Sequence, residues 1–239
     1  MNSKIPALKY FDLAKSSSLT QDDLEAYSNE IQQVCIAFPN EVNKLRAVLD
    51  KKYTKVYAIG IGDSLYSAES AKLDFWDRSG IQMEVLESQE FNNYYLEYMP
   101  QNSLVFICSG GGSAARTVES SYLAQQKGAT VVAITLSPTS RLSASCNHVL
   151  CYSTNKDNFI DGSRNYISLT LLIKLLGIRI GLWNGTLSSN KEKELLEGIV
   201  NDCRTGFKTC ISNEPLMKEL MTKAREQEKF YFLGAGPSL

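Results

Sequence analysis

A glycine-serine loop, Cys108-Ser109-Gly110-Gly111-Gly112-Ser113, constrains the fold of this chain more than any other stretch. It closes the apolar run 103–107 and precedes a helical pattern at 114–127. A strand that turns into a helix leaves several backbone N–H groups unpaired at the positive end of the helix dipole. Glycines let a ligand approach the backbone, and Ser109 and Ser113 add hydroxyl donors. The loop therefore predicts an anion site, most simply for a phosphate. The alternative is a tight turn that binds nothing.

Strand and helix patterns alternate on both sides of this loop. Short apolar runs that predict buried strands lie at 56–59, 83–86, 103–107, 130–135 and 148–152, and helical patterns lie at 65–78, 88–95, 114–127 and 163–183. This alternation implies a parallel sheet covered on both faces, the doubly wound α/β class. Ligands bind such sheets beyond the carboxyl ends of the strands, where the strand order reverses. A second glycine turn, 60–64, also follows a strand, so we expect both turns to line one pocket.

The segments outside this alternation are expected to be an arm and helices. Residues 1–18 show no periodicity, one helix is predicted to start at Thr20, and a second after Pro39-Asn40. Two more helical patterns, 190–210 and 214–227, lead to residues 229–239, which repeat the sequence of 55–65 with aligned lysine, tyrosine, glycines, serine and leucine. We therefore divide the chain into an N-terminal arm with helices (1–50), one α/β domain (51–185), and a helical linker with the start of a second, truncated domain (186–239). Chance similarity between two short strand-turns is the alternative.

Charge and hydropathy exclude some partners. The chain has 25 basic and 26 acidic residues, so we expect neither a nucleic acid nor a membrane surface as partner. No apolar core followed by a cleavage site opens the chain, and the longest apolar stretch, 167–182, is interrupted by Lys174 and Arg179. A cytoplasmic location is expected.

The cysteines indicate buried thiols and no metal site. The six are scattered without a C-x-x-C pair, which is typical of a reducing compartment. Cys146, His148 and Cys151 lie close in sequence, but they fall on a predicted strand and its approach, with no second ligand cluster. We expect no metal and no cofactor, and a structural role for His148.

Four segments, in order, resemble the sugar isomerase (SIS) domain family: 60–64, 87–91, 108–113 and 138–142. The likeness is to the tandem-SIS type, such as the isomerase domain of glucosamine-6-phosphate synthase and fructoselysine-6-phosphate deglycase, and covers about residues 20–239. It implies a three-layer αβα sandwich with a flavodoxin-like, five-stranded parallel sheet. Family members bind phosphosugars, either to convert them or to regulate genes and enzymes.

The resemblance also implies a phosphosugar-binding set. Carried over to this chain, the set is Ser64 from the first turn, Cys108, Ser109, Gly110, Gly111 and Ser113 from the family's Ser-x-Ser-Gly-x-Thr loop, and Ser163 at the start of the long helix. Cys108 and Gly110 replace the two serines of that loop, so two hydroxyl contacts are missing and binding through backbone N–H groups is expected. Ser163 either contacts the sugar or acts as an ordinary N-cap.

Candidate catalytic groups are few. The resemblance implies that the catalytic groups of the synthase, a glutamate, a lysine and a histidine, come from its second domain and from a neighbouring subunit. In this chain, the corresponding residues would lie beyond Leu239. Glu69 and Lys72, one helical turn apart, are the paired acid and base that we place nearest the pocket. A solvent-facing ion pair is the favoured interpretation of that pair.

The sequence thus predicts a cytoplasmic phosphosugar-binding protein. In full-length form it would be an amino-sugar-phosphate isomerase, deaminase or deglycase, and at least a homodimer. A non-catalytic phosphosugar sensor is the alternative from another class. A nucleotide-binding domain comes third, because the turn with Gly60 and Gly62 lacks the third glycine of the dinucleotide fingerprint.

Overall fold

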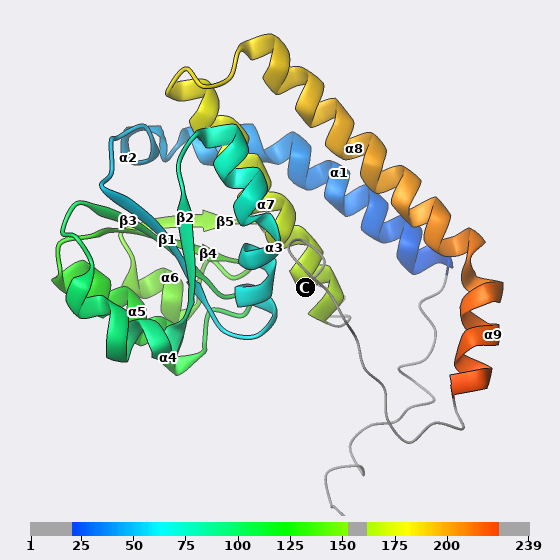
Figure 1. The fold of residues 1–239 in the computed structure, drawn as a ribbon, viewed down its shortest axis with the longest axis horizontal. Coiled ribbons are helices and arrows are strands. Elements are labelled where there is room, and N and C mark those ends of the chain that lie inside the picture. The colour runs from blue at the N-terminus through cyan, green and yellow to red at the C-terminus, as the bar shows by residue number, and fades with distance from the viewer. Residues whose placement is uncertain (1–20, 153–161, 225–239) are drawn as a thin grey trace, which may run out of the picture.

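The structure is a computed structural model that describes residues 21–152 and 162–224. Its centre is a five-stranded sheet in the order β2-β1-β3-β4-β5, in which all neighbouring strands are parallel (Figure 1). The strands are β1 (Lys55–Gly60), β2 (Met83–Glu87), β3 (Ser103–Cys108), β4 (Thr130–Thr135) and β5 (His148–Cys151). This order is the flavodoxin-like one, and it reverses between β1 and β3. The predicted α/β class with a parallel sheet is confirmed.

Helices cover both faces of the sheet. One face carries α3 (Asp63–Ser79) and α7 (Gly162–Trp183); the other carries α4 (Ser88–Glu90), the short turns η2 (Phe91–Tyr95) and η3 (Leu96–Tyr98), α5 (Ala115–Gln126) and α6 (Arg141–Ser145) (Figure 1). Because side chains alternate along a strand, Leu104 and Phe106 of β3 enter the first core, and Val105 and Ile107 enter the second. Every residue of β3 is buried, as expected for a central strand covered on both faces.

A second layer of helices lies outside α7. There α1 (Gln21–Asn43) and α8 (Ser189–Ser212) lie side by side (Figure 1). The side chain of Arg204 on α8 donates to Gln32 Oε1 on α1 at 3.0 Å. The short helices α2 (Arg46–Leu49) and α9 (Glu214–Ala224) complete the described elements.

The prediction of a helix start after Pro39 is wrong. Helix α1 continues through Pro39 to Asn43. A proline inside a helix removes one backbone hydrogen bond and clashes with the preceding turn. Here the neighbouring Phe38 and Val42 are buried in the core on the α1 side of the sheet, and this packing holds the helix together across the proline.

Helix α7 corrects a second expectation. Among the described residues, one segment, Asn165–Trp183, is long and apolar enough to cross a membrane by length and composition. From the sequence we expected no apolar stretch long enough to span a membrane, because Lys174 and Arg179 interrupt residues 167–182. However, 61% of the segment is buried inside the protein, as in the core helix of a soluble domain. Leu172, Leu175 and Leu176 belong to the core that α7 shares with α3 and the sheet.

The predicted division of the chain at residues 50 and 185 stays a prediction. Helix α8 contributes Ile199, Val200 and Phe207 to the edge of the core that includes α1. Residues 229–239, on which the predicted repeat depends, lie outside the described residues, as do the arm residues 1–18.

Candidate functional site

The carboxyl ends of the strands define the candidate site. Helices α3, α5, α6 and α7 each follow one of the strands β1, β3, β4 and β5. Because the strands are parallel, all four helices begin at the same edge of the sheet. The positive ends of the dipoles of α3, α5 and α7 lie there. In the short helix α6, the N–H groups of Leu142 and Ser143 are already used, by the Gly112 carbonyl and by Ser140 Oγ.

The loop after β3 is fixed to β4. Ser109 N–H donates to the carbonyl of Ile134 at 3.0 Å, and the carbonyl of Gly110 accepts from Leu136 N–H and from Thr135 Oγ1, both at 3.0 Å. Ser109 N–H and the Gly110 carbonyl thus continue the sheet ladder past the end of β3. The loop is therefore held rigidly at the point where the strand order reverses.

A turn follows within the same loop. Gly112 N–H donates to the carbonyl of Ser109 at 3.1 Å and to its Oγ at 3.2 Å. Gly112 has φ +60°, a left-handed conformation that side chains disfavour, and a Cβ there would lie 2.2 Å from Ser140 Oγ. Only glycine fits this position.

The loop leaves three backbone donors unused. Among the described residues, the N–H groups of Gly110, Gly111 and Ser113 donate to no protein acceptor. Gly111 and Ser113 are exposed, and Ser109 is 9% exposed. Free N–H groups close together ahead of a helix N-terminus, such as the successive pair on Gly110 and Gly111, suit an oxyanion.

The first glycine turn lies beside this loop. Gly60 ends β1, and a Cβ there would approach the backbone of Ser64 at 3.0 Å and the carbonyl oxygen of Cys108 at 3.3 Å. Ser64, in the first turn of α3, is 6% exposed, and its hydroxyl makes no hydrogen bond to any residue in the described ranges. The two turns therefore leave neighbouring strands at the same edge of the sheet, and the pocket between them stays a prediction.

Cys108 faces away from the loop. Its side chain has no exposed surface and lies in the core beneath α7. Burial raises the pKa of its thiol to about 12, so the group is a neutral thiol at ordinary pH. At the site, Cys108 therefore presents its backbone.

The two candidate catalytic side chains, Glu69 and Lys72, form an ion pair with each other. Lys72 Nζ contacts Glu69 Oε1 on the surface of α3, with 39% and 26% of the two side chains exposed. This is the ion pair that the sequence favoured, and it ties both charges to the helix. Ser163 lies in the first turn of α7, but its side chain is outside the described residues.

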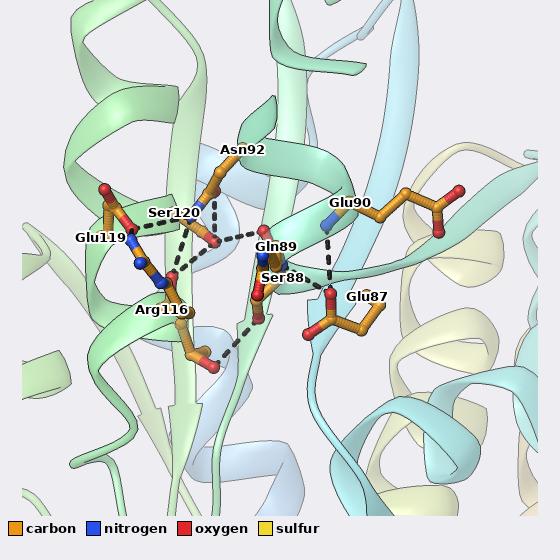
Figure 2. Close-up of polar contacts among 9 residues, drawn as sticks. Glu87, Ser88, Gln89, Glu90, Asn92, Arg116, Glu119 and Ser120 are labelled. Atoms are coloured by element: carbon orange, nitrogen blue, oxygen red, sulfur yellow. Dashed lines mark hydrogen bonds and ion pairs between the residues drawn. The ribbon is translucent and has the colours of Figure 1, made fainter. Parts of the chain in front are cut away.

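A polar cluster between α4 and α5 supports the loop from the second face of the sheet. Figure 2 shows the carboxylate of Glu87 capping α4, where it accepts from the N–H groups of Gln89 and Glu90 at 2.7 and 3.0 Å. Buried Ser88 and Thr117 share a hydrogen bond of 3.0 Å between their hydroxyls. This bond anchors the first turn of α5, which directly follows the glycine-serine loop.

The rest of the cluster is also internally paired. Ser120 donates to Asn92 Oδ1 at 2.7 Å, and Asn92 Nδ2 donates to the carbonyl of Arg116 at 3.2 Å (Figure 2). Arg116 in turn forms an ion pair with Glu119 at 2.8 Å. We interpret these residues as supports that fix α5 and the short α4 turn.

Sequence reasoning missed Asn165 and Tyr152. Tyr152, next to β5, donates to Asn165 Oδ1 at 2.6 Å, and the amide of Asn165 lies over Gly110. Nothing in the sequence marks Asn165 or Tyr152 as a site residue, because they meet Gly110 only when β3, β5 and α7 come together.

No metal centre is seen in the described part of the chain. Within residues 21–152 and 162–224, no group of three or more His, Cys, Asp or Glu side chains is placed to hold an ion. His148 opens β5, and its strand position pairs with Val132.

Residues 49–176 match the SIS domain, which is more than half of the 239-residue chain. The chain therefore belongs to the SIS domain family, as the sequence motifs predicted.

Curated relatives share one region of their length with this chain. The glutamine–fructose-6-phosphate aminotransferases [isomerizing] of Clostridium tetani and Thermotoga maritima are each 24% identical to it over 186 residues, covering 78% of this chain and 30% of the relative. The chain thus spans about a third of the length of the curated relatives that it matches.

Solved structures share the fold. The C-terminal domain of glucosamine-fructose-6-phosphate aminotransferase from Francisella tularensis superposes with a TM-score of 0.75 at 14% identity, over 93% of this chain and 64% of that one. A protein of E. coli CFT073, solved in complex with a ligand, superposes with a TM-score of 0.60 at 17% identity, over 82% of this chain and 99% of that one.

Proposed function

We propose that this chain binds a sugar phosphate at the carboxyl edge of its sheet, with the phosphate in the loop 108–113. The observation that carries the proposal is the set of three unused N–H groups, on Gly110, Gly111 and Ser113, beside the first turn of α5. The hydroxyls of Ser109 and Ser113 add donors, as does that of Ser64 at the neighbouring turn, which has no hydrogen-bond partner within the described ranges. The names of the relatives, which include fructose 6-phosphate, point to the same ligand class.

We assign the full-length protein to amino-sugar-phosphate isomerases, deaminases or deglycases. Isomerisation needs a base that moves a proton between adjacent carbons and an acid or cation at the carbonyl oxygen. The edge of the sheet supplies donors that bind and orient the phosphate. Glu69 and Lys72 neutralise each other, so we assign proton transfer to groups outside the described residues. We further propose a cytoplasmic location, no membrane or nucleic-acid partner, and an assembly of at least two copies.

A thermal-shift experiment tests the binding site. The melting temperature of the protein is measured with hexose and amino-hexose 6-phosphates, with inorganic phosphate, and with the unphosphorylated sugars. A ligand present at a hundredfold its Kd stabilises the folded state by about 2.7 kcal/mol, which for a chain of this size raises Tm by roughly 5 to 11 °C. The double substitution Ser109→Ala with Ser113→Ala is expected to remove most of the shift.

The control is Ser212→Ala, at the exposed end of α8, where the hydroxyl donates to the carbonyl of Thr209 in the same helix. It is expected to keep the full shift. A folded wild-type protein whose Tm responds to none of the phosphorylated sugars would contradict the proposal. Conversion of a bound sugar phosphate, followed by NMR, separates an enzyme from a binding protein. Sedimentation at micromolar concentration tests the proposed dimer, which a monomeric profile would rule out.

A further inference from the structure

The amide of Asn165 occupies the space above Gly110 where a side chain would stand. A Cβ added to Gly110 would lie 2.5 Å from Asn165 Oδ1, 2.7 Å from its Cγ and 2.8 Å from its Nδ2. These distances are far shorter than van der Waals contact, so Gly110 and Asn165 fit together only because Gly110 has no side chain. Asn165, in the first turn of α7, thereby places a polar group on the loop after β3.

The orientation of this amide is fixed by Tyr152. The Tyr152 hydroxyl donates to Asn165 Oδ1 at 2.6 Å, and the tyrosine is only 5% exposed. A buried phenol needs an acceptor for its proton, and Asn165 Oδ1 is the one it has among the described residues. Burial raises the pKa of Tyr152, so the phenol remains a donor at ordinary pH. The oxygen of the amide therefore points to Tyr152.

The opposite end of the amide is left free. Within the described ranges, Asn165 Nδ2 donates to no protein group, and the side chain is partly exposed. The nitrogen carries two N–H donors and lies beside a loop whose own N–H groups at Gly110 and Gly111 are also unused. An amide whose oxygen is held by the protein presents only donors to a ligand, which suits an anion.

We propose that Asn165 is a binding residue of the loop 108–113, whose Nδ2 donates to a phosphate oxygen in place of the side chain that Gly110 lacks. Tyr152 is its positioning residue, acting through the amide oxygen. This inference rests on the proposed phosphosugar site and names a residue of that site that the sequence motifs do not mark.

The first test is isothermal titration of the full chain with fructose 6-phosphate, glucosamine 6-phosphate and inorganic phosphate. Asn165→Leu keeps the approximate shape and removes the donor, and is expected to weaken binding of the phosphorylated probes about tenfold to hundredfold, the range for a hydrogen bond to a charged group. Asn165→Asp, also of similar shape, places a negative charge there and is expected to weaken it further. Asn201→Leu, at an exposed position of α8, is the matched control and is expected to bind as wild type does.

A second test separates a binding role from a structural one. Gly110→Ser alone is expected to disturb the loop, because its side chain overlaps Asn165. In an Asn165→Ala background the same serine has room, and its hydroxyl is expected to restore part of the affinity that Asn165→Ala loses. Tyr152→Phe is expected to lower Tm while weakening phosphate binding less than Asn165→Leu does, because the donor itself remains.

The outcomes distinguish this inference from the proposed function. If folded Asn165→Leu or Asn165→Asp binds fructose 6-phosphate with an affinity within twofold of the wild-type value, the inference is overturned and the proposed function stays intact. Binding of inorganic phosphate alone, lost in Asn165→Leu, supports the inference and overturns the proposed sugar phosphate. A wild-type protein that binds none of the three probes overturns both.

Discussion

Helices α3 and α7 touch through glycine, and this contact gives a sharp prediction about stability. Gly181 of α7 lies against the end of α3, where a Cβ would meet the carbonyl oxygen of Arg78 at 2.1 Å and its carbonyl carbon at 3.0 Å. Both neighbours are backbone atoms, which no rotamer change can move. Replacing Gly181 with alanine therefore requires the two helices to separate.

The size of the effect follows from two opposing terms. In an open helix interior, glycine to alanine stabilises by about 0.5 to 1 kcal/mol through backbone entropy. Overpacking a well-packed contact costs about 1 to 3 kcal/mol, and we take the upper end because the overlap is with backbone. The net expectation for Gly181→Ala is a loss of about 2 kcal/mol, which for a chain of this length lowers Tm by roughly 4 to 8 °C.

Gly198 of α8 provides the matched control. A Cβ there would meet no atom of the described residues within 4 Å, so Gly198→Ala should show only the favourable term and raise Tm by roughly 1 to 4 °C. Both variants are measured by urea and thermal unfolding, followed by far-UV circular dichroism. A Gly181→Ala protein as stable as Gly198→Ala would refute the close packing of α3 on α7.

Three further outcomes are expected at the site and in the core. Gly112→Ala combines a left-handed φ with an overlap on Ser140, so it should lower the free energy of unfolding in urea by about 2 kcal/mol and abolish the ligand-induced Tm shift. Gly111→Ala is its control and should fold normally, because its Cβ would lie 3.8 Å from Ser113 Oγ, an ordinary contact distance. In the folded protein at pH 8, iodoacetamide should modify exposed Cys210 and spare buried Cys108, and equal labelling in peptide mass spectrometry would contradict this. Because burial raises the pKa of Cys108 from 9.0 to about 12, the thiol loses its proton at lower pH in the unfolded chain than in the folded one. The free energy of unfolding should therefore fall as pH rises from about 9 to 12. Urea midpoints measure this fall, which should be less steep in Cys108→Ala.

Local pattern was enough to predict most of the fold. Short apolar runs between polar turns predicted all five strands to within about two residues, because a strand covered on both faces has little choice of composition. The order of the motifs then predicted the family, and parallel pairing predicted that the turns after β1 and β3 share an edge. Helix α6 was not anticipated, since its five residues follow Pro138 with no periodic pattern long enough to detect.

The site was predicted less completely, for a physical reason. The glycines and serines of the loop can be recognised from local composition. The contact of Asn165 with Gly110 and the hydrogen bond from Tyr152 exist only in the folded chain, and one asparagine or tyrosine in a sequence carries no mark of either. Pro39 shows the same limit, because tertiary packing outweighs its helix-breaking preference.

The pairing of α1 with α8 has a consequence for synthesis on the ribosome. The contact between Gln32 and Arg204 joins segments that are 172 residues apart in the sequence, so the apolar flank of α1 that faces α8 is left uncovered until α8 has emerged. The sheet and its glycine turns belong to the stretch between them and are complete earlier. A nascent chain stalled before α8 would thus carry the completed glycine-serine loop on a domain with an exposed apolar helix, which is the state that chaperones recognise.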